Sequence, residues 1–157
     1  MIDRIETFKL AIQNEIMSQN LYRMLANSFK SNPEISLAFK NLVPMEQIHE
    51  EKLRDAYEKE FPGSTLEVDL KLTHKVKPED ITDPQKVLDF AIAREMIAFE
   101  SYTKMAKEST DKELIKLLEE LANEEDYHKT ILETEILRFD GLMTWFDASE
   151  LNGLVEY

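Results

Sequence analysis

The chain carries one pattern of acidic, aromatic and imidazole residues twice, about 80 positions apart. The pattern is a Glu, a Tyr seven residues later, and then Glu-x-x-His; its members are Glu15, Tyr22, Glu46 and His49 in the first copy and Glu95, Tyr102, Glu125 and His128 in the second. The offsets are 95 − 15 = 80 and 125 − 46 = 79, so the two halves run almost in register. Repetition of this kind predicts that each half forms the same structural unit.

The composition favours helices along the whole chain. The sequence has 157 residues with only 3 Gly and 5 Pro, and it is rich in Leu, Glu, Lys and Ala, which are strong helix formers. We expect one domain spanning 1–157, because a chain of this length can bury a substantial core. The expected long helices are 3–30, 33–61, 84–109 and 110–140, and one short helix is expected within 142–157.

The ends of these helices are marked by capping residues. Asn32 followed by Pro33 has the form of a helix start, and Thr110 with Glu113 has the form of a capping box. Pro44 lies inside the second expected helix, where it removes one backbone hydrogen bond and should bend the helix locally.

The connections between the helices set the expected topology. The first and second helices, and the third and fourth, are joined by short turns, so each pair is expected to be antiparallel. The connection 62–83 is long enough to cross a bundle, and 65–70 within it alternates like a strand. We therefore expect an all-α, antiparallel four-helix bundle with one long crossover, and a short C-terminal helix containing Trp145 and Phe146.

Each long helix has an apolar seam that an acidic residue interrupts near its middle. The seam positions alternate in steps of four and three, which places them on one face of a helix. They are Phe8, Ile12, Glu15, Gln19, Tyr22, Ala26 and Phe29; Phe39, Leu42, Glu46, His49 and Leu53; Leu88, Ile92, Glu95, Phe99, Tyr102 and Ala106; and Leu114, Leu118, Leu121, Glu125, His128 and Leu132. The repeated acids are therefore expected to face the core.

Four buried carboxylates need a compensating positive charge. A buried, unpaired carboxylate is costly enough that it would bind a proton or unfold the site, whereas two divalent cations would balance four carboxylates. In Glu-x-x-His the two side chains share one helix face, roughly 4.5 Å apart along the axis. The sequence predicts a dinuclear metal centre with the ligands Glu15, Glu46, His49, Glu95, Glu125 and His128. In an acidic chain, surface ion pairs in a metal-free bundle are the alternative.

Other polar residues near the seams have more than one interpretation. Tyr22 and Tyr102 are either core aromatics whose hydroxyls need a partner or donors to a ligand carboxylate, and the two interpretations are compatible. Gln19 is a further candidate donor. Glu124 is expected to point about 100° away from Glu125 into solvent, and His74, in the crossover, is expected to be an exposed loop residue.

Charge and composition exclude several classes of protein. The absence of Cys removes disulfides, thiol catalysis and thiolate-bound iron. The net charge of −13 argues against a nucleic-acid partner. No apolar run is long enough to span a membrane, and the N-terminus has no signal-peptide pattern. We expect a soluble cytoplasmic protein.

The repeated residues resemble those of the ferritin-like superfamily and, within it, of rubrerythrin-related proteins. The resemblance implies that the six Glu and His residues bind two iron ions and that both tyrosines hydrogen-bond to them. The chain departs from typical rubrerythrins in two ways. It has no Cys for a rubredoxin domain, and Ala98 stands where they have an extra ligand Glu. Its six-ligand set is closer to that of bacterioferritin.

The resemblance implies a non-haem di-iron oxidoreductase that reduces H₂O₂ or O₂ in oxidative-stress defence, with electrons from a separate donor protein. The alternatives are a ferroxidase or iron-storage subunit of the ferritin or bacterioferritin type, and a metal-binding bundle without turnover. Manganese and zinc suit mixed Glu and His ligands as well as iron does. A homo-oligomer, at least a dimer, is expected.

Overall fold

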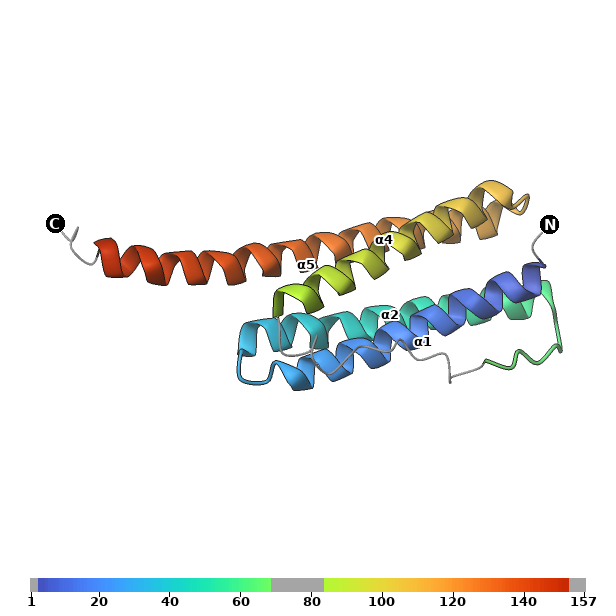
Figure 1. Ribbon diagram of the computed structural model, residues 1–157. Helices are drawn as coiled ribbons and strands as arrows, with labels where there is room; N and C mark the ends of the chain where they lie inside the picture. Colours follow the sequence, from blue (N-terminus) through green and yellow to red (C-terminus); the bar gives the residue numbers. More distant parts are fainter. Residues whose placement is uncertain (1–2, 69–83, 153–157) are drawn as a thin grey trace.

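The protein folds into a bundle of four helices. The computed structural model describes residues 3–68 and 84–152, and for 84 and 136–152 it describes the backbone alone. Along these residues the helices are α1 (Arg4–Ser28), α2 (Pro33–Glu60), α4 (Pro84–Glu108) and α5 (Lys112–Asn152). Helices α1 and α2 form one closely packed pair and α4 and α5 the other (Figure 1). The predicted all-α four-helix bundle is confirmed.

The helix starts follow local capping chemistry. The side chain of Asn32 accepts a hydrogen bond from the backbone N–H of Ile35, with Pro33 in the first turn, as predicted. Pro44 lies within α2 without ending it. The predicted cap of the last helix is wrong, because the capping residue is Asp111 and not Thr110. The backbone N–H of Glu113 donates a hydrogen bond to Asp111 Oδ1 at 2.9 Å. A carboxylate at this position accepts hydrogen bonds from the first-turn N–H groups, and its negative charge lies next to the positive end of the helix dipole, which is stabilising.

The last helix is longer than predicted. We expected a break near Gly141 and a separate short helix, but α5 continues without interruption to Asn152 and extends past the rest of the bundle (Figure 1). A glycine ends a helix by adopting a left-handed conformation. Among the described residues only Gly63 does so, with φ 74°. Gly141 is therefore an ordinary helical residue.

This assignment predicts the effect of a substitution. Gly141→Ala should favour the helical state by about 0.5–1 kcal/mol, because alanine loses less backbone entropy in a helix. Circular dichroism at 222 nm should then become slightly more negative. Gly63→Ala is the matched control and should lower stability, because its backbone is left-handed. A loss of helicity in Gly141→Ala would show that this glycine is a helix break.

The structure describes the first part of the predicted crossover 62–83, up to residue 68. Residues 64–68 have no regular secondary structure, so the strand-like alternation of that stretch does not form a strand there. The remainder of 65–70, and His74, lie outside the described residues. So do the side chains of Trp145 and Phe146.

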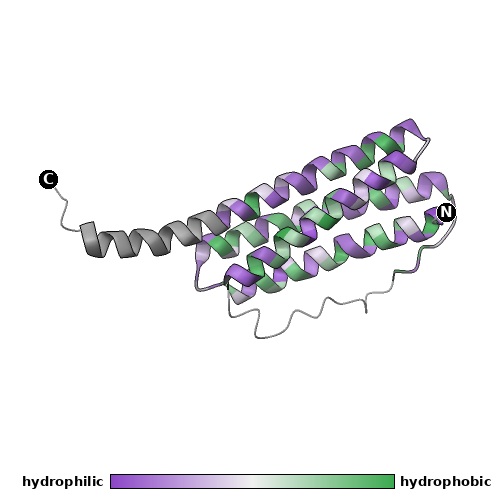
Figure 2. Ribbon diagram, turned by 45° about the horizontal axis from the view of Figure 1, so that its top comes forward, coloured by the Kyte–Doolittle hydropathy of each residue, from purple (hydrophilic) through white to green (hydrophobic). Residues whose placement is uncertain are grey.

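The core consists of two apolar clusters that lie toward opposite ends of the bundle. The first includes Leu21, Leu25, Phe39, Leu42, Leu88 and Leu132. The second includes Phe8, Ile12, Leu53, Tyr57, Leu118 and Leu121. Apolar and polar residues are interspersed along the helices (Figure 2), as expected where each helix buries one stripe. Each large apolar side chain contributes about 1.5–3 kcal/mol on full burial. The predicted site residues occupy the positions between the two clusters.

The predicted seams are correct except on α4. Phe99 is 36% exposed, whereas Ala98 is partly buried against the second cluster. The helical period of 3.6 lies between a step of three and a step of four. From Glu95 to Tyr102 the buried face therefore follows Ala98, and Phe99 lies on the outer surface.

Candidate metal centre

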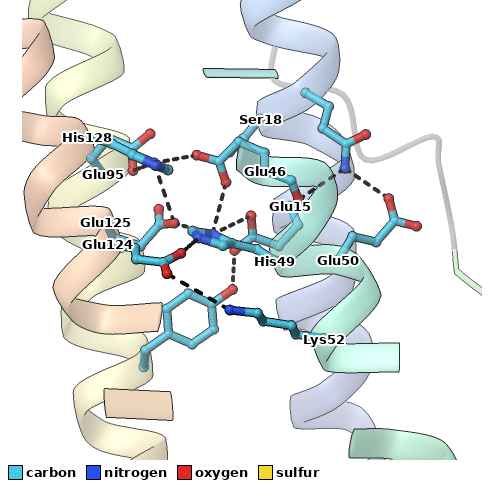
Figure 3. A network of polar contacts seen from close by, with 12 residues as sticks. Glu15, Ser18, Glu46, His49, Glu50, Lys52, Glu95, Glu124, Glu125 and His128 are labelled. Atoms are coloured by element: carbon cyan, nitrogen blue, oxygen red, sulfur yellow. Dashed lines mark hydrogen bonds and ion pairs between the residues drawn. The ribbon is translucent and has the colours of Figure 1, made fainter. Parts of the chain in front are cut away.

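Six acidic and imidazole side chains converge in the middle of the bundle. Each of them is at most 2% exposed, although all six are ionisable. The members are Glu15 from α1, Glu46 and His49 from α2, Glu95 from α4, and Glu125 and His128 from α5. Figure 3 shows them pointing toward one another across the space between the two helix pairs. The structure thus brings together all six residues that the sequence predicted as ligands.

The six side chains form two overlapping sets, each with the arrangement of a metal site. One set is Glu15, Glu46, His49 and Glu125, and the other is Glu46, Glu95, Glu125 and His128. Within each set the potential ligand atoms all lie within 4.8 Å of one another. Glu46 and Glu125 belong to both sets, so these two carboxylates would be bridging ligands if each set held an ion. Glu15 and Glu95 each belong to one set and would be terminal ligands.

The inward-facing atoms of the cluster lack hydrogen-bond partners. The buried atoms include both oxygens of Glu46, Oε2 of Glu15 and of Glu95, Oε1 of Glu125, and Nδ1 of both histidines. Two close contacts exist, from His49 Nδ1 to Glu125 Oε1 at 2.7 Å and from His128 Nδ1 to Glu46 Oε1 at 2.8 Å. Neither pair counts as a hydrogen bond, so these atoms remain without hydrogen-bond partners. Buried polar atoms are rarely left unpaired, and this donor set fits metal ions.

Without a cation, protons take part of the compensating role. Burial, together with the negative charge of Glu46, raises the pKa of Glu15, and burial with the charge of Glu15 raises that of Glu125. Burial alone would raise the pKa of Glu46, but the close approach of Glu15 and both histidines lowers it overall. Burial alone would lower the pKa of His128, but Glu46 and Glu95 raise it to about 9. The raised pKa values of Glu15, Glu125 and His128 favour their protonated forms, which lowers the negative charge of the metal-free cluster.

Two tyrosines connect the centre across helices α1 and α4. The hydroxyl of Tyr22 donates to Glu95 Oε1, and the hydroxyl of Tyr102 donates to Glu15 Oε1. Burial first, and then the charges of these carboxylates, raise the pKa of both tyrosines. Both hydroxyls therefore stay protonated and act as donors. Each tyrosine contacts the terminal carboxylate of the other half, so the contacts follow the internal repeat.

Removing either hydroxyl should cost stability. Tyr102→Phe leaves one oxygen of Glu15 without its donor, and a buried group that loses its partner costs about 1–3 kcal/mol. Tyr22→Phe should cost about as much, because the repeat relates the two contacts. Urea unfolding of the metal-loaded proteins measures both. Tyr57→Phe is the control, because this buried tyrosine pairs with the neutral hydroxyl of Ser64 at 2.9 Å. Losses no larger than that of the control would show that the tyrosines only fill space.

The sequence analysis missed the contact of Glu124 with the centre. Its carboxylate reaches His49 Nε2 from α5, although its side chain remains 44% exposed. The prediction that it points into solvent was therefore incomplete, because a long side chain on α5 can reach the neighbouring α2. The one signal in the sequence is that this acid directly precedes Glu125.

Gln19 lies beside the centre without contacting its carboxylates. Its side-chain nitrogen donates to Glu50 Oε1 at 2.8 Å and lies 3.5 Å from the backbone oxygen of Glu46. Gln19 therefore connects α1 to the backbone that carries a bridging carboxylate. Glu50, which the sequence analysis did not select, fixes the other end of this contact.

Comparison with known proteins agrees with this geometry. The family model described as Rubrerythrin matches residues 6–136, which include all six cluster residues. The chain belongs to the rubrerythrin family. A search of curated proteins found no match. Among solved structures, a hypothetical protein from Pyrococcus furiosus is 27% identical, with a TM-score of 0.74 and 92% of each chain covered. The rubrerythrin-family assignment and the buried cluster together indicate a metal site.

No helix within the described ranges is long and apolar enough to cross a membrane. Ala98 is partly buried on α4 against the second apolar cluster, and as an alanine it supplies no seventh ligand.

Proposed function

We propose that this rubrerythrin-family protein is a non-haem di-iron oxidoreductase that reduces hydrogen peroxide, or O₂, in oxidative-stress defence. The observation that carries the proposal is the pair of ligand sets sharing Glu46 and Glu125. Two divalent cations would carry a charge of +4 against the four carboxylates' −4, which removes the cost of burying them. Iron is the metal that the family implies, and manganese or zinc could bind the same ligands.

The residues of the chain hold and isolate the reacting centre. The six Glu and His residues would hold two ferrous ions, and this pair would supply the two electrons that, with two protons, reduce one H₂O₂ to two water molecules. Tyr22 and Tyr102 keep the terminal carboxylates of Glu95 and Glu15 in place. The apolar clusters on both sides keep bulk water away from the carboxylates. In this dry surrounding, electrostatic interactions are stronger than in water.

The electrons must be replaced after each turnover. The chain has no Cys, so it has no thiolate-bound iron of its own. We propose that a separate electron-donor protein reduces the centre and that the chain acts as a homo-oligomer, at least a dimer.

A ferroxidase or storage subunit is the second candidate function. The observation that favours it is Ala98, which gives the centre a symmetric six-ligand set like that of bacterioferritin. A storage subunit would act by assembling into a hollow shell. A metal-binding bundle without turnover is the third candidate.

Rate constants with two oxidants separate these functions. The diferrous protein, prepared anaerobically, is mixed with H₂O₂ or with O₂ in a stopped-flow instrument. We expect faster oxidation by H₂O₂, because a two-electron oxidant matches a site that releases one electron from each of two ions. The mass of the assembly is measured in parallel. Faster oxidation by O₂, together with a shell-sized particle that retains many irons per chain, would favour storage, and no oxidation by either would favour the inert bundle.

A further inference from the structure

The two imidazoles of the centre differ in what their outer nitrogen contacts. Both turn Nδ1 toward the carboxylates. The outer nitrogen of His49, Nε2, contacts the carboxylate of Glu124. The carboxylate contacts of His128 all involve Nδ1, and within the described part of the chain no carboxylate pairs with its Nε2. The centre is therefore nearly symmetric in its six ligands and asymmetric just outside them.

The internal repeat shows where this asymmetry arises. Glu124 precedes the second Glu-x-x-His motif, and the corresponding position in the first half is 124 − 79 = 45, which is Met45. Met45 is partly buried and packs against the first apolar cluster. A thioether carries no charge and is only a weak acceptor. Met45 therefore cannot offer His128 the charged acceptor that Glu124 offers His49.

We propose that Glu124 is a positioning residue that makes the two metal positions unequal, so that the position at His49 binds a divalent cation first and more tightly. By accepting the Nε2–H of His49, Glu124 leaves Nδ1 unprotonated and directed at the carboxylates, and makes it a stronger donor. The other oxygen of Glu124 lies 4.0 Å from Lys52 Nζ, so the carboxylate is oriented from both sides (Figure 3). This proposal rests on the metal centre proposed above.

The size of the effect follows from the exposure of Glu124. Removing an outer partner of a ligand histidine typically costs 10- to 100-fold in metal affinity. The side chain of Glu124 is 44% exposed, so water weakens its influence. We therefore expect the lower end of that range, about tenfold.

Titration of the metal-free protein with Co²⁺ tests the proposal. Calorimetry and the visible absorption of Co²⁺ should show two steps in the parent, with dissociation constants about tenfold apart. In Glu124→Ala the first step should weaken about tenfold and merge with the second, which should not change. Glu124→Gln should retain part of the difference, because its amide oxygen accepts the same hydrogen bond without the charge. Glu119→Ala, which removes an exposed acid from the same helix, is the matched control and should change neither step.

A spectroscopic readout separates positioning from a general charge effect. With one Co²⁺ bound, the shifted Nε2–H proton resonance of His49 should exchange with water more slowly in the parent than in Glu124→Ala. Equal affinities in the parent, an equal loss at both positions in Glu124→Ala, or the same loss in Glu119→Ala would each overturn the proposal. Binding of two Co²⁺ ions with equal affinity would leave the metal centre intact, whereas no binding at all would remove the centre and this proposal with it.

Discussion

Removing the metal with a chelator should lower the melting temperature of the protein by roughly 8–16 °C. A cation present at about 1,000 times its dissociation constant stabilises the folded state by about 4.1 kcal/mol. In a protein of this size each kcal/mol corresponds to about 2–4 °C. The physical reason is that Glu15, Glu46, Glu95 and Glu125 are all at most 2% exposed and would lose their counter-charge. Differential scanning calorimetry with and without chelator at constant pH measures the shift.

The bridging carboxylates provide the control for this prediction. Glu46→Gln combined with Glu125→Gln removes two buried negative charges while keeping the side-chain volumes. The double variant should therefore depend much less on metal for its stability. A parent melting temperature that is indifferent to the chelator would show that the carboxylates are compensated by protons and that metal does not bind there.

The His128→Ala substitution should nearly abolish oxidation of the ferrous protein by H₂O₂. It removes the only imidazole of the second ligand set. Loss of an outer partner alone typically costs 10- to 100-fold, so loss of the ligand itself should slow the reaction by at least about 100-fold. Bound iron should fall from two ions per chain toward one. Stopped-flow absorption gives the rate constant, and elemental analysis gives the iron content.

His74→Ala is the matched control, because it removes the one histidine of the chain outside the repeated motifs. It should leave both the rate constant and the iron content unchanged. If His128→Ala kept the parent's rate constant, the oxidation would depend on a site other than this centre.

The sequence alone was sufficient to predict the six converging residues, for a physical reason. Helical periodicity places Glu125 and His128 on the same face as Leu121 and Leu132, which must be buried, so the face of the acid is fixed by its neighbours. The internal repeat allows the same argument from helical periodicity and buried neighbours to be made independently for Glu46. The fold follows from the same seams, because four such faces can be buried together only in a bundle.

The details that sequence reasoning missed depend on packing between helices or on local choices of nearly equal energy. Glu124 reaches His49 only because α5 packs beside α2, which the pattern of one helix does not reveal. Ala98 and Phe99 are both compatible with the seam of α4, and packing decides between them. At Gly141, a glycine can either end a helix or continue it, and the sequence does not distinguish the two outcomes.

The most direct test of the central claim is the number and coupling of the metal ions in the parent protein. Metal-free protein is loaded anaerobically with ferrous iron, unbound iron is removed, and iron per chain is measured together with the Mössbauer spectrum after oxidation. Ligand sets that share Glu46 and Glu125 predict close to two irons per chain and the spectrum of a coupled diferric pair. A ratio near zero, or a ratio near one with a mononuclear spectrum, would contradict the account.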